Sequence, residues 1–172
     1  MWARFPVVYA AVATLVGSGI VLAEEQSLHR RLRFPNSTRH AVERAIHGAR
    51  LRLGDWQCQQ VLTDFQDVSG NSLLANLTAM RRSPVEYLDE LWFVDASDAK
   101  PCRGDGTLVA YTSPGRRIIY VCAARFAHPL FRLTDRLAEL LIIHEFLHSL
   151  GLGENPPTSD QITKQVARRC GR

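Results

Sequence analysis

The stretch from Leu140 to Glu154 constrains this chain most, because it sets three chemically reactive side chains among apolar ones. His144, Glu145 and His148 form the pattern His-Glu-x-x-His within it. On an α-helix, residues four apart share a face, so both imidazoles can bind one metal ion. Glu145 lies about 100° further around the helix, where it can reach a metal-bound water but is badly placed to ligate. This pattern is typical of zinc hydrolysis, in which the metal acidifies a water and the glutamate takes its proton.

The surrounding residues predict that this segment is a buried helix. Thr134 is a good N-cap residue, Asp135 suits the first turn, and Gly151 suits the C-terminus. Apolar residues cover most of the helix surface: Leu140, Leu141, Ile142, Ile143, Phe146, Leu147 and Leu150. The alternative is a solvated helix face that carries two histidines and a glutamate by chance. Burial favours the metal site, because buried His and Glu side chains must be paired or bound.

The motif extends beyond the two histidines. Gly151 is seven residues after His144, and Glu154 is ten residues after it. The segment from Thr134 to Glu154 therefore resembles the metzincin pattern H-E-x-x-H-x-x-G-x-x-H, with Glu154 at the place of the third histidine. The resemblance implies a zincin-type, zinc-dependent endopeptidase. The chain departs from that family in its glutamate and in having no methionine after residue 80, which removes the Met-turn.

The third metal ligand is the open question of the site. A catalytic zinc usually takes three protein ligands and one water. No histidine follows the motif, so the downstream candidates are the carboxylates of Glu154 and Asp160. Glu154 has the metzincin-like position, whereas Asp160 is expected to cap the last helix. His128 is the upstream rival, and the alternative for Glu154 is an ordinary exposed loop carboxylate.

The N-terminal residues predict a targeting segment. Arg4 precedes an apolar run from Val7 to Leu22, and Val21-Leu22-Ala23 fits a signal-peptidase site, which gives a signal peptide over residues 1–23. An uncleaved N-terminal anchor is the alternative. We expect a secreted or periplasmic protein with a flexible segment over 24–37 and one zincin-like domain over 38–172. Without Arg4 the chain has 20 basic and 17 acidic residues and no basic run with interleaved aromatics, so we expect no nucleic acid partner. We also expect a monomer that is not stably inserted in a membrane after signal cleavage.

The cysteine count predicts two disulfides. All four cysteines lie after the signal peptide, and an even count in an exported chain is typical of paired cysteines. Three connectivities are possible. We favour Cys102 with Cys122, which bracket an expected hairpin, and Cys58 with Cys170, which would tie the chain end to the first expected strand. A cysteine metal site is the alternative, but no C-x-x-C spacing exists.

Hydrophobic spacing predicts an α+β fold: a twisted mixed sheet of about four strands packed on an N-terminal helix and the metal-binding helix. The expected helices span residues 38–53, 73–80, 134–150 and 158–169, and the expected strands span 58–65, 88–94, 107–112 and 118–122. The zincin resemblance implies that the strand over 107–112 lies at the sheet edge and hydrogen-bonds an extended peptide or protein substrate.

The leading hypothesis from the sequence is an exported zinc metallopeptidase with one Zn²⁺ per chain. His144, His148 and Glu154 would hold the metal, and Glu145 would be the general base. Tyr111 and Tyr120 are candidates for stabilising the oxyanion. The competing hypotheses are a zincin-like binding module without catalysis and a zinc hydrolase of a non-peptide amide, since zinc, glutamate and water do not define the acyl group.

Overall fold

A computed structural model of the chain describes residues 32–103, 106–126 and 134–172. The signal peptide, most of the segment expected to be flexible, and His128 lie outside the described residues. In chain order the elements are β1 (Leu32–Arg33), α2 (Asn36–Leu53), α3 (Trp56–Gln59), α4 (Val61–Asp64), α5 (Leu73–Met80), α6 (Pro84–Asp89), β2 (Trp92–Asp95), α7 (Lys100–Arg103), β3 (Ala110–Tyr111), β4 (Ile118–Val121), α8 (Ala123–Phe126), α9 (Asp135–Ser149) and α10 (Ser159–Cys170).

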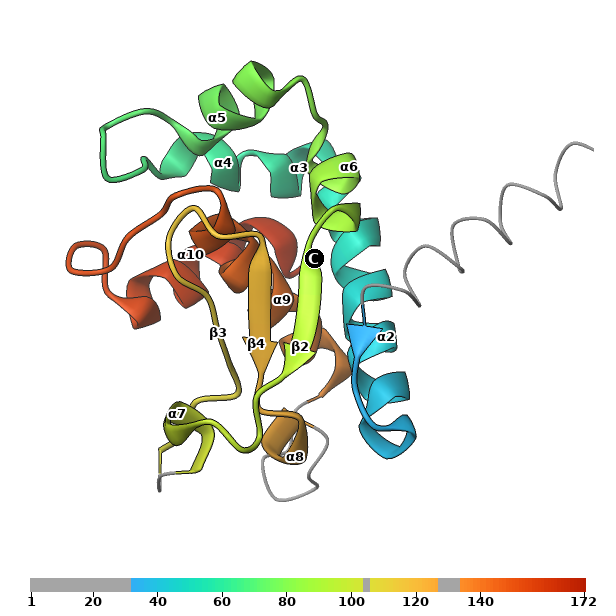
Figure 1. The fold of residues 1–172 in the computed structure, drawn as a ribbon. Coiled ribbons are helices and arrows are strands. Elements are labelled where there is room, and N and C mark those ends of the chain that lie inside the picture. The colour runs from blue at the N-terminus through green and yellow to red at the C-terminus, as the bar shows by residue number, and fades with distance from the viewer. Residues whose placement is uncertain (1–31, 104–105, 127–133) are drawn as a thin grey trace, which may run out of the picture. The chain divides into compact units, whose positions relative to one another are not determined.

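The sheet is mixed and has four strands, in agreement with the expected α+β class. Its order is β1-β2-β4-β3, with β2 parallel to both β1 and β4, and β3 antiparallel to β4 (Figure 1). The register pairs Phe93 with Ile119 on the central strands and Ala110 with Val121 at the edge. The segment 107–112 therefore does supply an edge strand, although only Ala110 and Tyr111 are regular.

The prediction of a strand over 58–65 is wrong, because this segment forms part of the short helices α3 and α4. Asp55 caps α3 by accepting a hydrogen bond from the Gln57 amide at 2.6 Å. Cys58, Val61 and Leu62 are buried together. Their spacing of three and four residues is typical of a helix. The short apolar run Val61-Leu62 fits a strand as well, which is why a strand was predicted here.

The fourth strand comes instead from the segment expected to be flexible. Leu32 is buried and pairs with Phe93, and α2 begins at Asn36 rather than at residue 38. A strand of two residues is too short to show an alternating pattern, so the sequence carries no signal for it.

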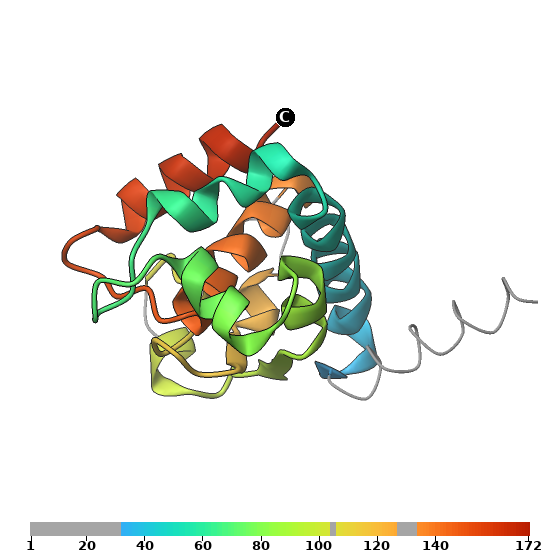
Figure 2. The same cartoon turned by 90° about the horizontal axis from the view of Figure 1, so that it is seen from above.

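A layer of helices lies behind the sheet in Figure 1, and the same elements are seen from above in Figure 2. The helix α9 contacts β3 and β4, and it packs against α2 and α10. At Gly48 of α2, a Cβ atom would overlap the Glu139 side chain of α9, so the glycine allows these two helices to approach closely. The central position of α9 explains why Ile142, Ile143 and Phe146 are fully buried.

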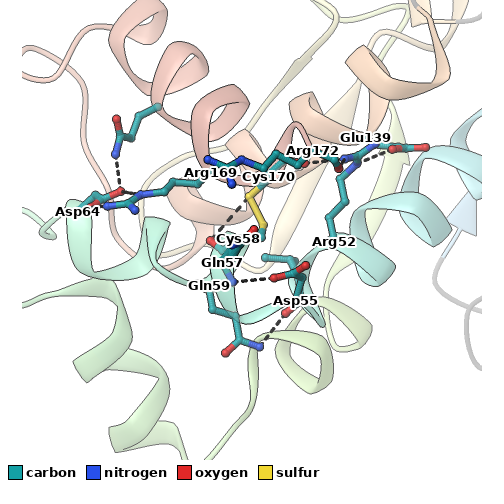
Figure 3. Close-up of a disulfide and its surroundings, with 12 residues drawn as sticks. Arg52, Asp55, Gln57, Cys58, Gln59, Asp64, Glu139, Arg169, Cys170 and Arg172 are labelled. Carbon is teal, nitrogen blue, oxygen red and sulfur yellow. Dashed lines mark hydrogen bonds and ion pairs between the residues drawn. A yellow bond between two sulfur atoms is a disulfide. The ribbon is translucent and has the colours of Figure 1, made fainter.

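Both favoured disulfides are confirmed. Cys102 and Cys122 join α7 to the end of β4, at a sequence separation of 20 and with Cα atoms 5.3 Å apart. Cys58 and Cys170 join α3 to the end of α10 across a sequence separation of 112, with Cα atoms 4.3 Å apart (Figure 3). Two such bridges are typical of an oxidising, extracytoplasmic environment. Among the described residues, no helix combines the length and the apolar character that a membrane span needs.

Candidate metal centre

The helix α9 presents the His-Glu-x-x-His motif as expected. Its N-cap is Thr134, whose hydroxyl accepts a hydrogen bond from the Leu137 amide at 3.2 Å. His144, Glu145 and His148 are all buried, with 4%, 6% and 5% of their surface exposed. A solvated helix face is therefore excluded, and these three polar side chains need partners inside the protein.

The end of α9 turns the chain back toward the two histidines. The Gly151 amide donates to the His148 carbonyl at 2.9 Å and the Leu152 amide donates to the Leu147 carbonyl at 3.3 Å, which together make a Schellman motif. Gly151 has a φ of +109°, and a Cβ there would lie 3.0 Å from the Asp67 Cβ. Asn76 supports the turn by donating its side-chain amide to the Leu150 carbonyl at 2.9 Å.

This reversal brings Glu154 to the histidine pair. The two Nε2 atoms lie 3.0 Å apart, and Glu154 Oε1 lies 3.3 Å from His148 Nε2 and 3.8 Å from His144 Nε2. Zinc binds imidazole nitrogen and carboxylate oxygen at about 2.0–2.2 Å, so tetrahedral ligand atoms lie roughly 3.3–3.6 Å apart. The observed separations fall close to this spacing, and the group of His144, His148 and Glu154 can hold a metal ion.

The rival carboxylate has other partners. Asp160 is exposed and pairs with Lys164 at 2.6 Å on the surface of α10. Its expected role as the cap of this helix is wrong, because Thr158 caps α10 in a reciprocal capping box with Gln161. Within the described part of the chain, Glu154 is thus the carboxylate that joins the two histidines.

Hydrogen bonds on the far side of each imidazole orient the rings. His148 Nδ1 lies 2.7 Å from the Leu152 carbonyl, which can only accept, so Nδ1 carries the proton and Nε2 presents a lone pair to the site. His144 Nδ1 lies 3.0 Å from the Thr163 hydroxyl of α10. Contacts of this kind fix the tautomer and the ring orientation of metal-binding histidines.

Burial sets the charges of the site. It lowers the pKa of His144 from 6.5 to about 4, with a further contribution from His148, so this imidazole is neutral at neutral pH, as a metal ligand must be. Burial, followed by the charge of Glu154, raises the pKa of Glu145 from 4.5 to about 8. Glu145 Oε2 is buried and has no hydrogen-bond partner among the described residues. A cation bound nearby would relieve the cost of burying this carboxylate.

The two tyrosines suggested for oxyanion stabilisation have other contacts. Tyr111 and Tyr120 stack with ring centroids 5.1 Å apart, and both pack against Cys102 and Cys122. Burial raises the pKa of Tyr111. These contacts place both rings against the Cys102–Cys122 disulfide and give no support to a role in oxyanion stabilisation.

Three groups that support the ligands were not predicted from the sequence: the Leu152 carbonyl, the Thr163 hydroxyl and the Asn76 amide. Thr163 lies 19 residues after His144, and Asn76 lies 74 residues before Leu150. Only the packing of α10 and α5 against the end of α9 brings them together, so no local pattern marks them. Comparisons of the chain with protein-family models, curated proteins and solved structures found no match.

Proposed function

We propose that this chain is a zinc-dependent metalloendopeptidase of the zincin type. One observation carries the proposal: two buried imidazole nitrogens and the exposed carboxylate of Glu154 converge at ligand spacing, beside the buried carboxyl group of Glu145. Two histidines and a glutamate form a ligand set typical of catalytic zinc, which keeps a fourth position open. The mixed sheet in front of the metal-binding helix supports the zincin-like assignment.

Glu145 is the general base in this proposal. His144, His148 and Glu154 would hold a zinc ion, which would supply Lewis-acid chemistry by acidifying the attacking water and polarising the substrate carbonyl. Glu145 accepts the proton of the attacking water and returns it to the leaving amine. Its buried position supports this role. Its Oε2 has no hydrogen-bond partner among the described residues and is available for the proton, and the raised pKa favours holding it.

The edge strand supports a peptide as the substrate. Strand β3 pairs with β4 on one side and is the last strand of the sheet. The turn between these two strands contacts the end of α9, where the Gly115 amide donates to the His148 carbonyl at 2.9 Å. An extended peptide can add to such an edge through main-chain hydrogen bonds and so lie across the metal site.

Metal analysis of the exported protein tests the proposal, together with hydrolysis of unfolded casein. We expect about one zinc per chain, loss of zinc in the His144→Ala, His148→Ala double variant, and hydrolysis that a chelator stops and zinc restores. Glu154→Gln should weaken zinc binding at least about tenfold, whereas the control Asp160→Asn should not.

Two results would contradict the proposal. Full zinc occupancy in the double histidine variant would remove the metal site from α9. A zinc-loaded wild type that hydrolyses no protein, peptide or amide would favour a non-catalytic binding module.

A further inference from the structure

The helix α10 brings a hydroxyl group to the back of the proposed metal centre. Thr163 Oγ1 lies 3.0 Å from His144 Nδ1, on the ring edge opposite the nitrogen that faces His148 and Glu154. The backbone carbonyl that supports His148 can only accept a hydrogen bond. A threonine hydroxyl can both donate and accept, so the two imidazoles have supports of different chemistry.

The difference matters because the two Nε2 atoms lie only 3.0 Å apart. The Leu152 carbonyl holds the His148 proton on Nδ1, so His148 Nε2 presents a lone pair. Without a cation, this contact is favourable only if His144 Nε2–H donates to His148 Nε2. His144 Nδ1 is then unprotonated and must accept a hydrogen bond from the Thr163 hydroxyl.

A metal ion requires the opposite arrangement at His144. Both Nε2 lone pairs must then point at the ion, so the proton of neutral His144 must be on Nδ1. From that position Nδ1–H donates to the Thr163 oxygen. The ring stays neutral and the number of bound protons is unchanged, because the proton that leaves Nε2 is matched by one taken up from solvent at Nδ1.

We infer that Thr163 is a positioning residue whose hydroxyl changes from donor to acceptor when the metal binds, so that His144 is supported in both tautomers. The inference rests on the proposed metal centre. A carboxylate or carbonyl at this place would support only the Nδ1–H tautomer. An aliphatic side chain would support neither.

The fixing of α10 at both ends makes this role feasible. The Thr158–Gln161 capping box holds its first turn. At its last turn, the disulfide from Cys58 holds Cys170, and Arg169 makes two hydrogen bonds of 2.7 Å to the Asp64 carboxylate (Figure 3). The hydroxyl is therefore presented by a helix that is anchored on α3 and α4 as well as packed against α9.

Histidine tautomers measured by long-range ¹H–¹⁵N correlation test the switch in the whole exported protein, with zinc as the probe. We expect the wild-type His144 to carry its proton on Nε2 in the presence of chelator and on Nδ1 with zinc. Thr163→Val should weaken zinc binding about 10–100-fold, the range found when such supporting partners are lost. Thr163→Ser should restore wild-type affinity, because the hydroxyl returns.

The matched control is Thr78→Val, since the Thr78 hydroxyl also lies on a helix but donates to the Leu74 carbonyl of its own helix. It should leave zinc affinity and the His144 tautomer unchanged. If wild type binds zinc but its His144 has the same tautomer with and without the metal, or if Thr163→Val binds zinc as tightly as wild type, the Thr163 inference alone is overturned. If wild type binds no zinc, the proposed metal centre is itself wrong, and the role of Thr163 with it.

Discussion

Two glutamates on α9 have the same chemistry and opposite surroundings. The side chain of Glu139 is 17% exposed and accepts a hydrogen bond from Arg52 Nε at 2.6 Å. The same arginine donates Nη1 to the carbonyls of Cys170, at 2.5 Å, and Arg172, at 3.0 Å (Figure 3). Glu145 is 6% exposed, and its Oε2 has no partner among the described residues.

On this single helix Glu139 has a structural role, whereas Glu145 is the carboxyl group to which the proposed function assigns a chemical role. Glu139 is matched by a guanidinium and joins α2, α9 and the end of α10, so its charge contributes to holding the helices together. Glu145 keeps a buried oxygen that no described residue matches with a hydrogen bond, which costs free energy of folding. An unmatched buried carboxyl group next to metal-ligating side chains is typical of sites that have a chemical role.

The largest expected contrast between the two glutamates is in catalysis. Glu145→Gln should keep the fold and the zinc but lower kcat about 10²–10⁴-fold, because the amide cannot accept the proton of the attacking water. Glu139→Gln is the matched control and should keep kcat, since its partners are Arg52 and not the substrate. The measurement is casein or peptide hydrolysis by the two variants at equal zinc loading.

Two outcomes would break this contrast. Full activity in the zinc-loaded Glu145→Gln variant would show that another group is the base. A loss of activity in Glu139→Gln as large as in Glu145→Gln, with zinc still bound, would show that the two carboxylates do not have separate roles.

The next contrast is in stability, where the Glu139 variant and not the Glu145 variant should show the larger effect. Glu139→Gln should lower the free energy of unfolding by about 2 kcal/mol, because the largely buried Arg52 loses the negative charge that assists its hydrogen bond. Glu145→Gln should not destabilise the metal-free protein, since it replaces a buried carboxyl group for which the described residues supply no cation. Urea unfolding of both variants in chelator measures the difference, and equal destabilisation would contradict the structural role of Glu139.

The parts of the site that were predictable from the sequence depend on local chain chemistry. The caps of α9, Thr134 and Gly151, lie next to the residues they cap, and His144 and His148 are one helical turn apart. Glu154 was also predictable as a member of the candidate metal-binding group, because it follows Gly151 closely enough for one turn to return it to His144 and His148. Both disulfide pairs were favoured correctly, although the strand expected to carry Cys58 is a helix.

The parts that were not predictable depend on contacts between distant segments. Strand β1 contributes two residues, and its place beside β2 follows from sheet assembly rather than from a pattern in the chain. Thr163 and Arg52 are ordinary helix residues until α10 packs against α9 and α3. Short apolar runs such as Val61-Leu62 fit a strand or a helix equally well, and tertiary packing decides between them.

The smallest expected contrast is in how the stability of the metal-free protein depends on pH. The pKa of His144 is lowered to about 4, so between about pH 4 and 6.5 the unfolded chain binds a proton there that the folded protein does not. This makes stability rise with pH in that range. The pKa of Glu145 is raised to about 8, so between pH 4.5 and 8 the folded protein binds a proton that the unfolded chain has lost. This makes stability fall with rising pH.

The two effects oppose each other up to pH 6.5, and above it only that of Glu145 remains. Metal-free protein should therefore lose about 1–2 kcal/mol of stability between pH 6.5 and 8. Urea unfolding in chelator at these two pH values measures the loss. It should disappear in Glu145→Gln, where no proton can be released, and persist in Glu139→Gln, where Glu145 is intact. A loss of the same size in Glu145→Gln would assign the pH dependence to another group and would show that burial of Glu145 is not costly, because its ionised form would then have found a partner.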